Sequence, residues 1–326
     1  MPRRVFSTMG VRMRRISLLA LIATTLASAA WAHGSHDDGL PQGAHSHDHG
    51  WTLNLVRRAA AAAQMEIDEA QGLRFIRADG IANHATGRFP NDGNPNSIRR
   101  QDYYFRLPLK PQKTGCVVFY RPNHLFGVAV NGVVFDPNTA EFWRNDRSSG
   151  WMIEALSGAT PLGIDRNNAH VQPDGSYHYH GLPMGLLELL DYRNTMALIG
   201  WAADGFPIYG PFGYRDPRNP QSGLIELRPS WSLKAERDQP GPSGKPDGTY
   251  VLDYGWTQGS GDLDECNGRT GVTPEFPQGT YYYVVTKPFP HVPRCFMGTA
   301  DASFVKRGGA HTRGGGGRPP PMGQPR

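Results

Sequence analysis

The chain has 326 residues and a formal net charge of +5, with 38% hydrophobic and 10% aromatic residues. Gly (40) and Pro (28) make up about a fifth of it, which disfavours helix bundles and coiled coils because both residues break long helices. The positive charge lies at the two ends, since residues 33–305 hold 24 basic against 29 acidic residues. This distribution gives no indication of nucleic-acid binding.

Residues 1–32 have the pattern of a secretory signal peptide. Arg12, Arg14 and Arg15 form a positive region, residues 16–27 are apolar, and small residues follow at 27–32. We expect a periplasmic or secreted protein with no membrane span after cleavage. An uncleaved anchor helix is the alternative.

The next segment, residues 33–69, predicts a His-rich disordered stretch and a short helix. Its first part lacks apolar periodicity, and its composition is typical of loose transition-metal binding, with solubility or chance as the alternative. Its histidines are His33, His36, His45, His47 and His49. Residues 51–66 are the helix candidate. Residues 306–326 predict a disordered basic Gly/Pro tail, which leaves one domain over 70–305.

Short aromatic or β-branched runs in this domain alternate with turn signals, which predicts an all-β fold with only short helices. Strands are expected at 102–107, 115–120, 250–254 and 280–286. We expect a single sandwich- or barrel-like domain of antiparallel hairpins.

A weak internal repeat relates residues 125–137 to residues 198–211. Asn131-Gly132 aligns with Asp204-Gly205, and both dipeptides supply the positive φ angles of tight hairpin turns. The repeat indicates a duplicated sheet element. Two unrelated hairpins with the same turn chemistry are the alternative.

Residues 165–183 predict a hairpin that gathers three histidines. Gln172-Pro173-Asp174-Gly175 fits a type I turn, which places His170 opposite His178. Because side chains alternate along a strand, His170, His178 and His180 share one face and the two intervening tyrosines share the other. A register shift of one residue would separate His170 from the other two.

Three neutral imidazoles suit a divalent transition metal, with Zn or Cu expected first, and leave one coordination position open. An open position would permit Lewis-acid chemistry or water activation, with Asp165 or Asp204 as a neighbouring acid or base. Packing and hydrogen bonding of the histidines are the structural alternative.

The chain has three cysteines, and an oxidising compartment favours one disulfide, for which we pair Cys266 with Cys295. Between residues 260 and 271, a Gly-rich loop offers oxygen ligands of the kind that Ca²⁺ prefers; its carboxylates are Asp262, Asp264 and Glu265. A structural loop without a cation is favoured over this calcium site.

Tyr177-His178-Tyr179-His180-Gly181, preceded by Asp174-Gly175, resembles the signature of the YHYH-domain proteins. Similar blocks lie at 127–133, 200–211, 264–269 and 295–298, so the resemblance covers roughly residues 70–305. It implies an exported single domain and no particular reaction. The expected function is therefore metal binding through His170, His178 and His180. A metal-dependent extracellular hydrolase or oxidoreductase and a non-catalytic envelope or interaction module are the alternatives.

Overall fold

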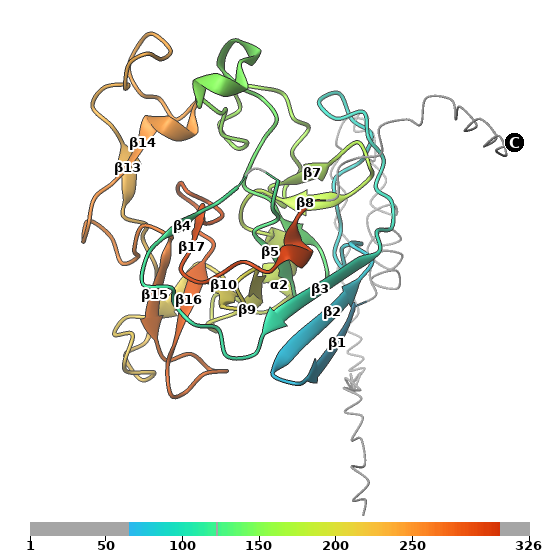
Figure 1. The fold of residues 1–326 in the computed structure, drawn as a ribbon, viewed down its shortest axis with the longest axis vertical. Coiled ribbons are helices and arrows are strands. Elements are labelled where there is room, and N and C mark those ends of the chain that lie inside the picture. The colour runs from blue at the N-terminus through green and yellow to red at the C-terminus, as the bar shows by residue number, and fades with distance from the viewer. Residues whose placement is uncertain (1–64, 122, 307–326) are drawn as a thin grey trace, which may run out of the picture. The chain divides into compact units, whose positions relative to one another are not determined.

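The computed structural model describes residues 65–121 and 123–306, and its centre is an eight-stranded mixed sheet that curls into a half-barrel (Figure 1). The strand order is β15-β16-β10-β9-β5-β6-β8-β7. In chain order these strands are β5 (Gly127–Ala129), β6 (Val134–Phe135), β7 (Ala169–Val171), β8 (Tyr177–Tyr179), β9 (Leu198–Ala202), β10 (Pro207–Tyr209), β15 (Gly268–Gly271) and β16 (Thr280–Val284). The predicted all-β class is confirmed, although two strand pairs in this sheet, β6/β8 and β10/β16, are parallel.

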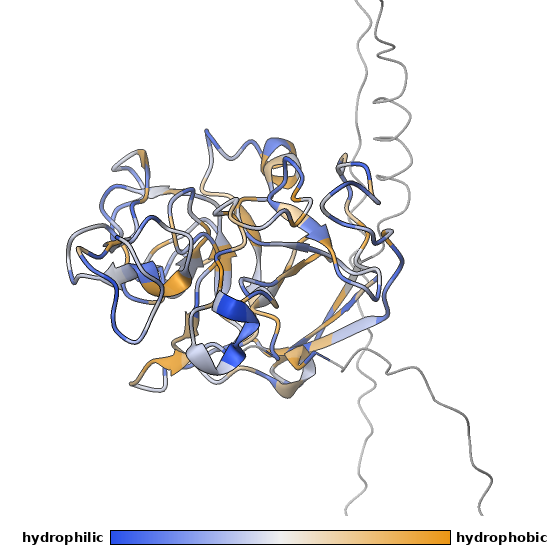
Figure 2. Cartoon of the chain, turned by 90° about the horizontal axis from the view of Figure 1, so that it is seen from above, coloured by the Kyte–Doolittle hydropathy of each residue, from blue (hydrophilic) through white to orange (hydrophobic). Residues whose placement is uncertain are grey.

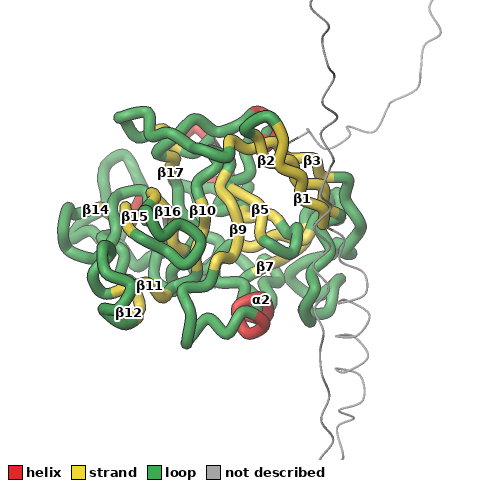
Figure 3. Tube along the Cα trace, turned by 90° about the horizontal axis from the view of Figure 1, so that it is seen from below, coloured by secondary structure: helices red, strands yellow, loops and turns green. Residues whose placement is uncertain are grey.

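Smaller sheets and short helices surround this centre, and loops make up most of the described residues (Figure 3). The smaller sheets are β1 (Met65–Ala70), β2 (Leu73–Ala78) and β3 (Tyr103–Pro108); β4 (Val118–Phe119) with β17 (Cys295–Phe296); β11 (Phe212–Tyr214) with β12 (Leu224–Glu226); and β13 (Trp231–Leu233) with β14 (Tyr254–Trp256). The helices are α2 (Met184–Leu189) and the 3₁₀ turns η1 (Trp143–Asn145), η2 (Arg147–Ser149), η3 (Val251–Asp253) and η4 (Ala302–Phe304). No helix among the described residues is long and apolar enough to cross a membrane.

Two predicted elements are wrong where the structure describes them. Residues 51–64 of the expected helix lie outside the described residues, but its last two, Met65 and Glu66, belong to β1. This strand pairs with β2 through a tight turn at Gln71 and Gly72, both with positive φ. The expected domain start at residue 70 therefore falls inside a strand. Residues 250–254 form mainly the turn η3 because the buried Asp253 carboxylate accepts the backbone N–H of Tyr250.

The internal repeat is confirmed, since its two hairpins have the same register and lie side by side. Gly127 pairs with Phe135 in the first hairpin, and Gly200 pairs with Ile208 at the corresponding place in the second. The second turn residue is a glycine in both, with φ angles of 85° and 92°. β5 and β9 pair antiparallel, which relates the hairpins by an approximate two-fold axis.

The duplication extends well beyond the segment that the sequence indicated. On one side β6 pairs parallel with β8, with Phe135 opposite Tyr179; on the other β10 pairs parallel with β16, with Ile208 opposite Tyr283. The outermost strands, β7 and β15, each pair antiparallel with the strand beside them. One half of the sheet, β5-β6-β8-β7, is thus repeated as β9-β10-β16-β15.

The loops before β7 and β15 are copies as well. Asn168 (φ 52°) and Asn267 (φ 53°) are both left-handed, and their carbonyls accept the backbone N–H of His180 and Val284 at 2.7 and 2.9 Å. This correspondence identifies the residues that replace the histidines in the second half. Arg269, Tyr282 and Val284 stand where His170, His178 and His180 stand in the first.

The main hydrophobic core packs against the central sheet, where the apolar residues concentrate (Figure 2). Tyr177 and Tyr179 of β8 and their counterparts Tyr281 and Tyr283 of β16 all belong to this core. A second, smaller apolar cluster contains Tyr282 and Val284, on the other face of β16. The face that carries the histidines in the first half is therefore filled by apolar packing in the second.

Candidate metal centre

The turn at residues 172–175 sets the register of the hairpin β7–β8. The Gln172 carbonyl accepts the Gly175 N–H at 2.8 Å, and the Ser176 carbonyl accepts the Gln172 N–H at 3.0 Å. Gly175 has a φ of 88°, a conformation that costs glycine nothing. His170 therefore lies opposite His178, as the turn chemistry predicts.

The two tyrosines of β8 anchor the hairpin through the face opposite the histidines. The Tyr177 hydroxyl donates to Asp165 at 2.7 Å, and the Tyr179 hydroxyl lies 2.6 Å from His84 Nε2 and 2.9 Å from Asn131 Nδ2. Both tyrosines are fully buried. These bonds hold β8 in one orientation and so fix the direction of its histidine side chains.

The three histidine rings form a nearly equilateral triangle. Their centroids are 4.6 Å apart for His170 and His178, 4.8 Å for His170 and His180, and 4.7 Å for His178 and His180. One ring nitrogen from each lies within 4.8 Å of the other two. Within residues 65–121 and 123–306, this is the group of His, Cys, Asp or Glu side chains placed to share one ion.

Hydrogen bonds at Nδ1 orient two of the rings. His170 Nδ1 lies 2.8 Å from the Leu162 carbonyl, and His178 Nδ1 lies 3.3 Å from the Ser176 carbonyl. A carbonyl only accepts, so both nitrogens carry the proton and both Nε2 atoms keep a lone pair. His178 Nε2 is 2.9 Å from His180 Nε2, and His180 Nδ1 is buried without a partner. Carbonyl contacts of this kind set the tautomer of metal-ligating histidines.

The surroundings favour the neutral form of all three imidazoles. Burial lowers the pKa of His170, and it lowers the pKa of His178 and His180 well below the ordinary value. The neighbouring histidines lower the pKa of His178 and His180 further, as does Lys306, which pairs with Asp136 at 2.5 Å. Neutral imidazole is the form that binds a metal.

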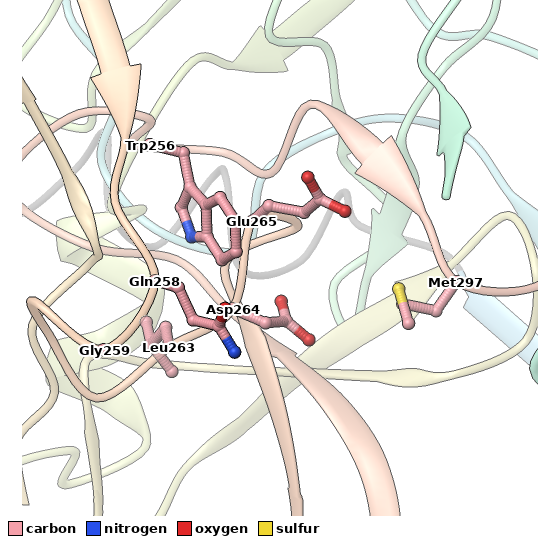
Figure 4. Close-up of a pocket in the computed structure, with 7 residues that line it drawn as sticks. All are labelled: Trp256, Gln258, Gly259, Leu263, Asp264, Glu265 and Met297. Atoms are coloured by element: carbon pink, nitrogen blue, oxygen red, sulfur yellow. The ribbon is translucent and has the colours of Figure 1, made fainter. Parts of the chain in front are cut away.

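The carboxylates of the loop at 260–271 do not form a cluster comparable to that of the three histidines. Asp262 accepts the Arg228 N–H at 2.8 Å, and Asp264 accepts the Cys266 N–H at 3.0 Å. The Asp264 and Glu265 side chains line a cavity of about 220 Å³ together with Trp256 and Met297 (Figure 4). The three carboxylates predicted for calcium are not gathered around one point.

The structure also describes the predicted cysteines and the two candidate acid or base residues. The Cys266–Cys295 disulfide is present, which confirms that pairing, and Cys116 is a free, exposed thiol. Asp165 and Asp204 bind tyrosine hydroxyls and backbone N–H groups, and burial raises the pKa of Asp204 to about 6. Neither is grouped with the histidines in the cluster. The signal-like segment, the tail beyond residue 306 and the histidines at 33, 36, 45, 47 and 49 lie outside the described residues.

One polar neighbour of the cluster was not anticipated. The Gln172 amide nitrogen lies 3.4 Å from His178 Nε2. The signal for it was present in the sequence, because Gln172 is two residues from His170 and so points to the same face of the hairpin.

The sequence model of the YHYH protein family matches residues 104–298, more than half of the chain. The chain belongs to the YHYH protein family. The matched region contains both halves of the duplicated sheet and all three clustered histidines. No match was found among curated proteins or among solved structures. Membership of the YHYH family therefore identifies the domain and leaves its function to be argued from the site.

Proposed function

We propose that this protein binds one divalent transition metal, Zn or Cu, through His170, His178 and His180. The triangular arrangement of the three rings carries the proposal. Metal–nitrogen bonds of about 2.0–2.1 Å from three imidazoles leave one position for another ligand. The surrounding groups supply what such a site needs: carbonyls that fix the tautomers of His170 and His178, neutral rings and a rigid hairpin.

The second half of the sheet provides an internal control for the alternative that the histidines only pack the core. The same strand pair there holds Tyr282 and Val284 in an apolar cluster, and Arg269 donates to the Tyr282 hydroxyl at 2.6 Å. The backbone arrangement therefore does not require histidines at these positions. Packing alone gives the His180 ring few contacts for its polar atoms, since its Nε2 meets His178 Nε2 at 2.9 Å and its Nδ1 is buried without a partner.

We further propose that the protein acts outside the cytosol. The signal-like pattern of residues 1–32 and the Cys266–Cys295 disulfide support an oxidising compartment. The His-rich stretch at 33–50 would then capture or deliver the metal.

Elemental mass spectrometry of the purified full chain tests the metal proposal. The five histidines of residues 33–50 are changed to alanine, so that only the domain is measured. We expect about one Zn or Cu per chain. The paired substitution His178→Gln and His180→Val should abolish it, and the control His291→Gln should retain it. Absence of bound metal and of affinity for added Zn²⁺ or Cu²⁺ would exclude the proposal, as would equal metal content in the paired variant.

A further inference from the structure

Gln172 is the fourth polar side chain on the histidine face of the hairpin. Its backbone N–H is bonded to Ser176, and its amide nitrogen reaches to 3.4 Å from His178 Nε2. In the second half of the sheet the corresponding residue is Gly271, which has no side chain. Gln172 is thus specific to the half of the domain that carries the histidines.

The distance from Gln172 to His178 matches the spacing of neighbouring ligands around a metal. At metal–nitrogen distances of 2.0–2.1 Å, two ligand atoms of a tetrahedral site are about 3.3 Å apart. The amide nitrogen therefore lies within the coordination region, and because an amide N–H only donates, it serves an atom bound to the metal and not the metal itself. When the lone pair of His178 Nε2 goes to the metal, the amide N–H loses that acceptor, and an atom bound at the fourth position replaces it.

Burial and charge indicate what can enter this position. His178 and His180 are fully buried, whereas His170 and Gln172 are partly exposed, so the cluster opens to solvent on their side. Three neutral imidazoles leave the charge of a divalent ion uncompensated, and no carboxylate belongs to the cluster. The carboxylates that act on His170 from outside the cluster are Glu141, Asp136 and Asp165, of which Asp136 is paired with Lys306 and Asp165 accepts the Tyr177 hydroxyl. An anion or a readily ionised water is the ligand that this charge favours.

We infer that the metal site is open, and that its fourth position takes water or a small inorganic anion held by a hydrogen bond from the Gln172 amide. This inference rests on the proposed metal site. It makes Gln172 a positioning residue for the exogenous ligand and not a metal ligand. A site of this kind is suited to act on small anionic or metal-activated substrates.

The test uses the full chain with the five histidines of residues 33–50 changed to alanine, loaded with one equivalent of Co²⁺, whose visible absorption reports coordination. Azide is the probe anion. We expect azide to change the spectrum saturably in the parent protein. Gln172→Leu should keep Co²⁺ affinity but weaken azide binding by about tenfold or more, the value of a hydrogen bond to a charged group. The exposed Gln221→Leu is the matched control and should change neither.

The other outcomes are distinguishable. A Co²⁺ spectrum that azide leaves unchanged in the parent would overturn the inference while the metal site stands. So would a Gln172→Leu variant that loses Co²⁺ affinity and gains azide affinity, because Gln172 would then itself occupy the fourth position. Failure of Co²⁺ to bind the parent at all would refute the proposed function as well.

Discussion

Acid should destabilise the metal-free protein through its buried histidines. Burial, helped by their mutual proximity, lowers the pKa of His178 and His180 in the folded protein. In the unfolded chain the same groups titrate near pH 6.5. The unfolded state therefore binds more protons below that pH, so stability is complete above about pH 6.5 and falls as the pH drops below it.

The size of the effect follows from the number of buried rings. Each imidazole that stays neutral in the folded state lowers the free energy of unfolding by about 1.4 kcal/mol for every pH unit below its ordinary pKa. Between pH 7.5 and pH 5.5, His178 and His180 together should lower the free energy of unfolding by about 3 kcal/mol. His170 is partly exposed and is left out of this figure.

Urea unfolding in the presence of a chelator, at pH 7.5 and pH 5.5, measures this loss. Between the two pH values, the free energy of unfolding of the variant with His178→Phe and His180→Val should fall by about 3 kcal/mol less than that of the parent. His291→Gln calibrates the assay, because burial lowers the pKa of His291 to about 4. Removal of this one ring should reduce the acid-induced loss of unfolding free energy by about 1.5 kcal/mol, half of the effect of the double variant. A double variant with the same pH dependence as the parent would refute the reasoning, since the two rings would then titrate as they do in the unfolded chain.

Three further predictions concern the metal, the disulfide and a turn. Because the rings are already neutral, Zn²⁺ binding at pH 6 should release few protons from them, whereas three rings with the ordinary pKa near 6.5 would release about two. Calorimetric enthalpies in buffers of different ionisation enthalpy should therefore agree at this pH, and a large difference would contradict the lowered pKa values. Reduction of the Cys266–Cys295 disulfide, whose cysteines are 29 residues apart, should lower the free energy of unfolding by about 3.5 kcal/mol, and an unchanged urea midpoint would contradict this. Gly205→Ala should lower the free energy of unfolding by about 3 kcal/mol or more, because the φ of Gly205 is 92° and the new Cβ would lie 2.7 Å from Pro108. Gly72→Ala has open space around the new Cβ and should lower it by about 1 kcal/mol. Equal losses in urea unfolding would contradict the turn geometry.

The histidine cluster could be predicted because it depends on local rules. The turn at Gln172–Gly175 fixes the register, and strand alternation then determines which side chains share a face. The pairing of His170 with His178 needed no information from distant parts of the chain. The Cys266–Cys295 pairing was similarly constrained, because only three cysteines were available.

The full extent of the duplication could not be predicted, because the amino-acid sequences of its two copies differ at most positions. Tyr177-His178-Tyr179-His180 and Tyr281-Tyr282-Tyr283-Val284 share only their two core tyrosines. The parallel pairing of β6 with β8 and of β10 with β16 joins strands that long loops separate, and no local pattern specifies such a pairing. The aspartate three residues before a left-handed asparagine, at Asp165 and Asp264, was the remaining trace of the repeat.

Diffraction from crystals grown with one equivalent of Zn²⁺, recorded on both sides of the zinc absorption edge, tests the central claim most directly. The account predicts one anomalous peak among the rings of His170, His178 and His180, about 2.0–2.1 Å from a nitrogen of each. It predicts no peak at the corresponding position in the second half, beside Arg269 and Tyr282. Crystals in which the histidine triangle holds no anomalous scatterer, while zinc is bound elsewhere on the chain, would contradict it.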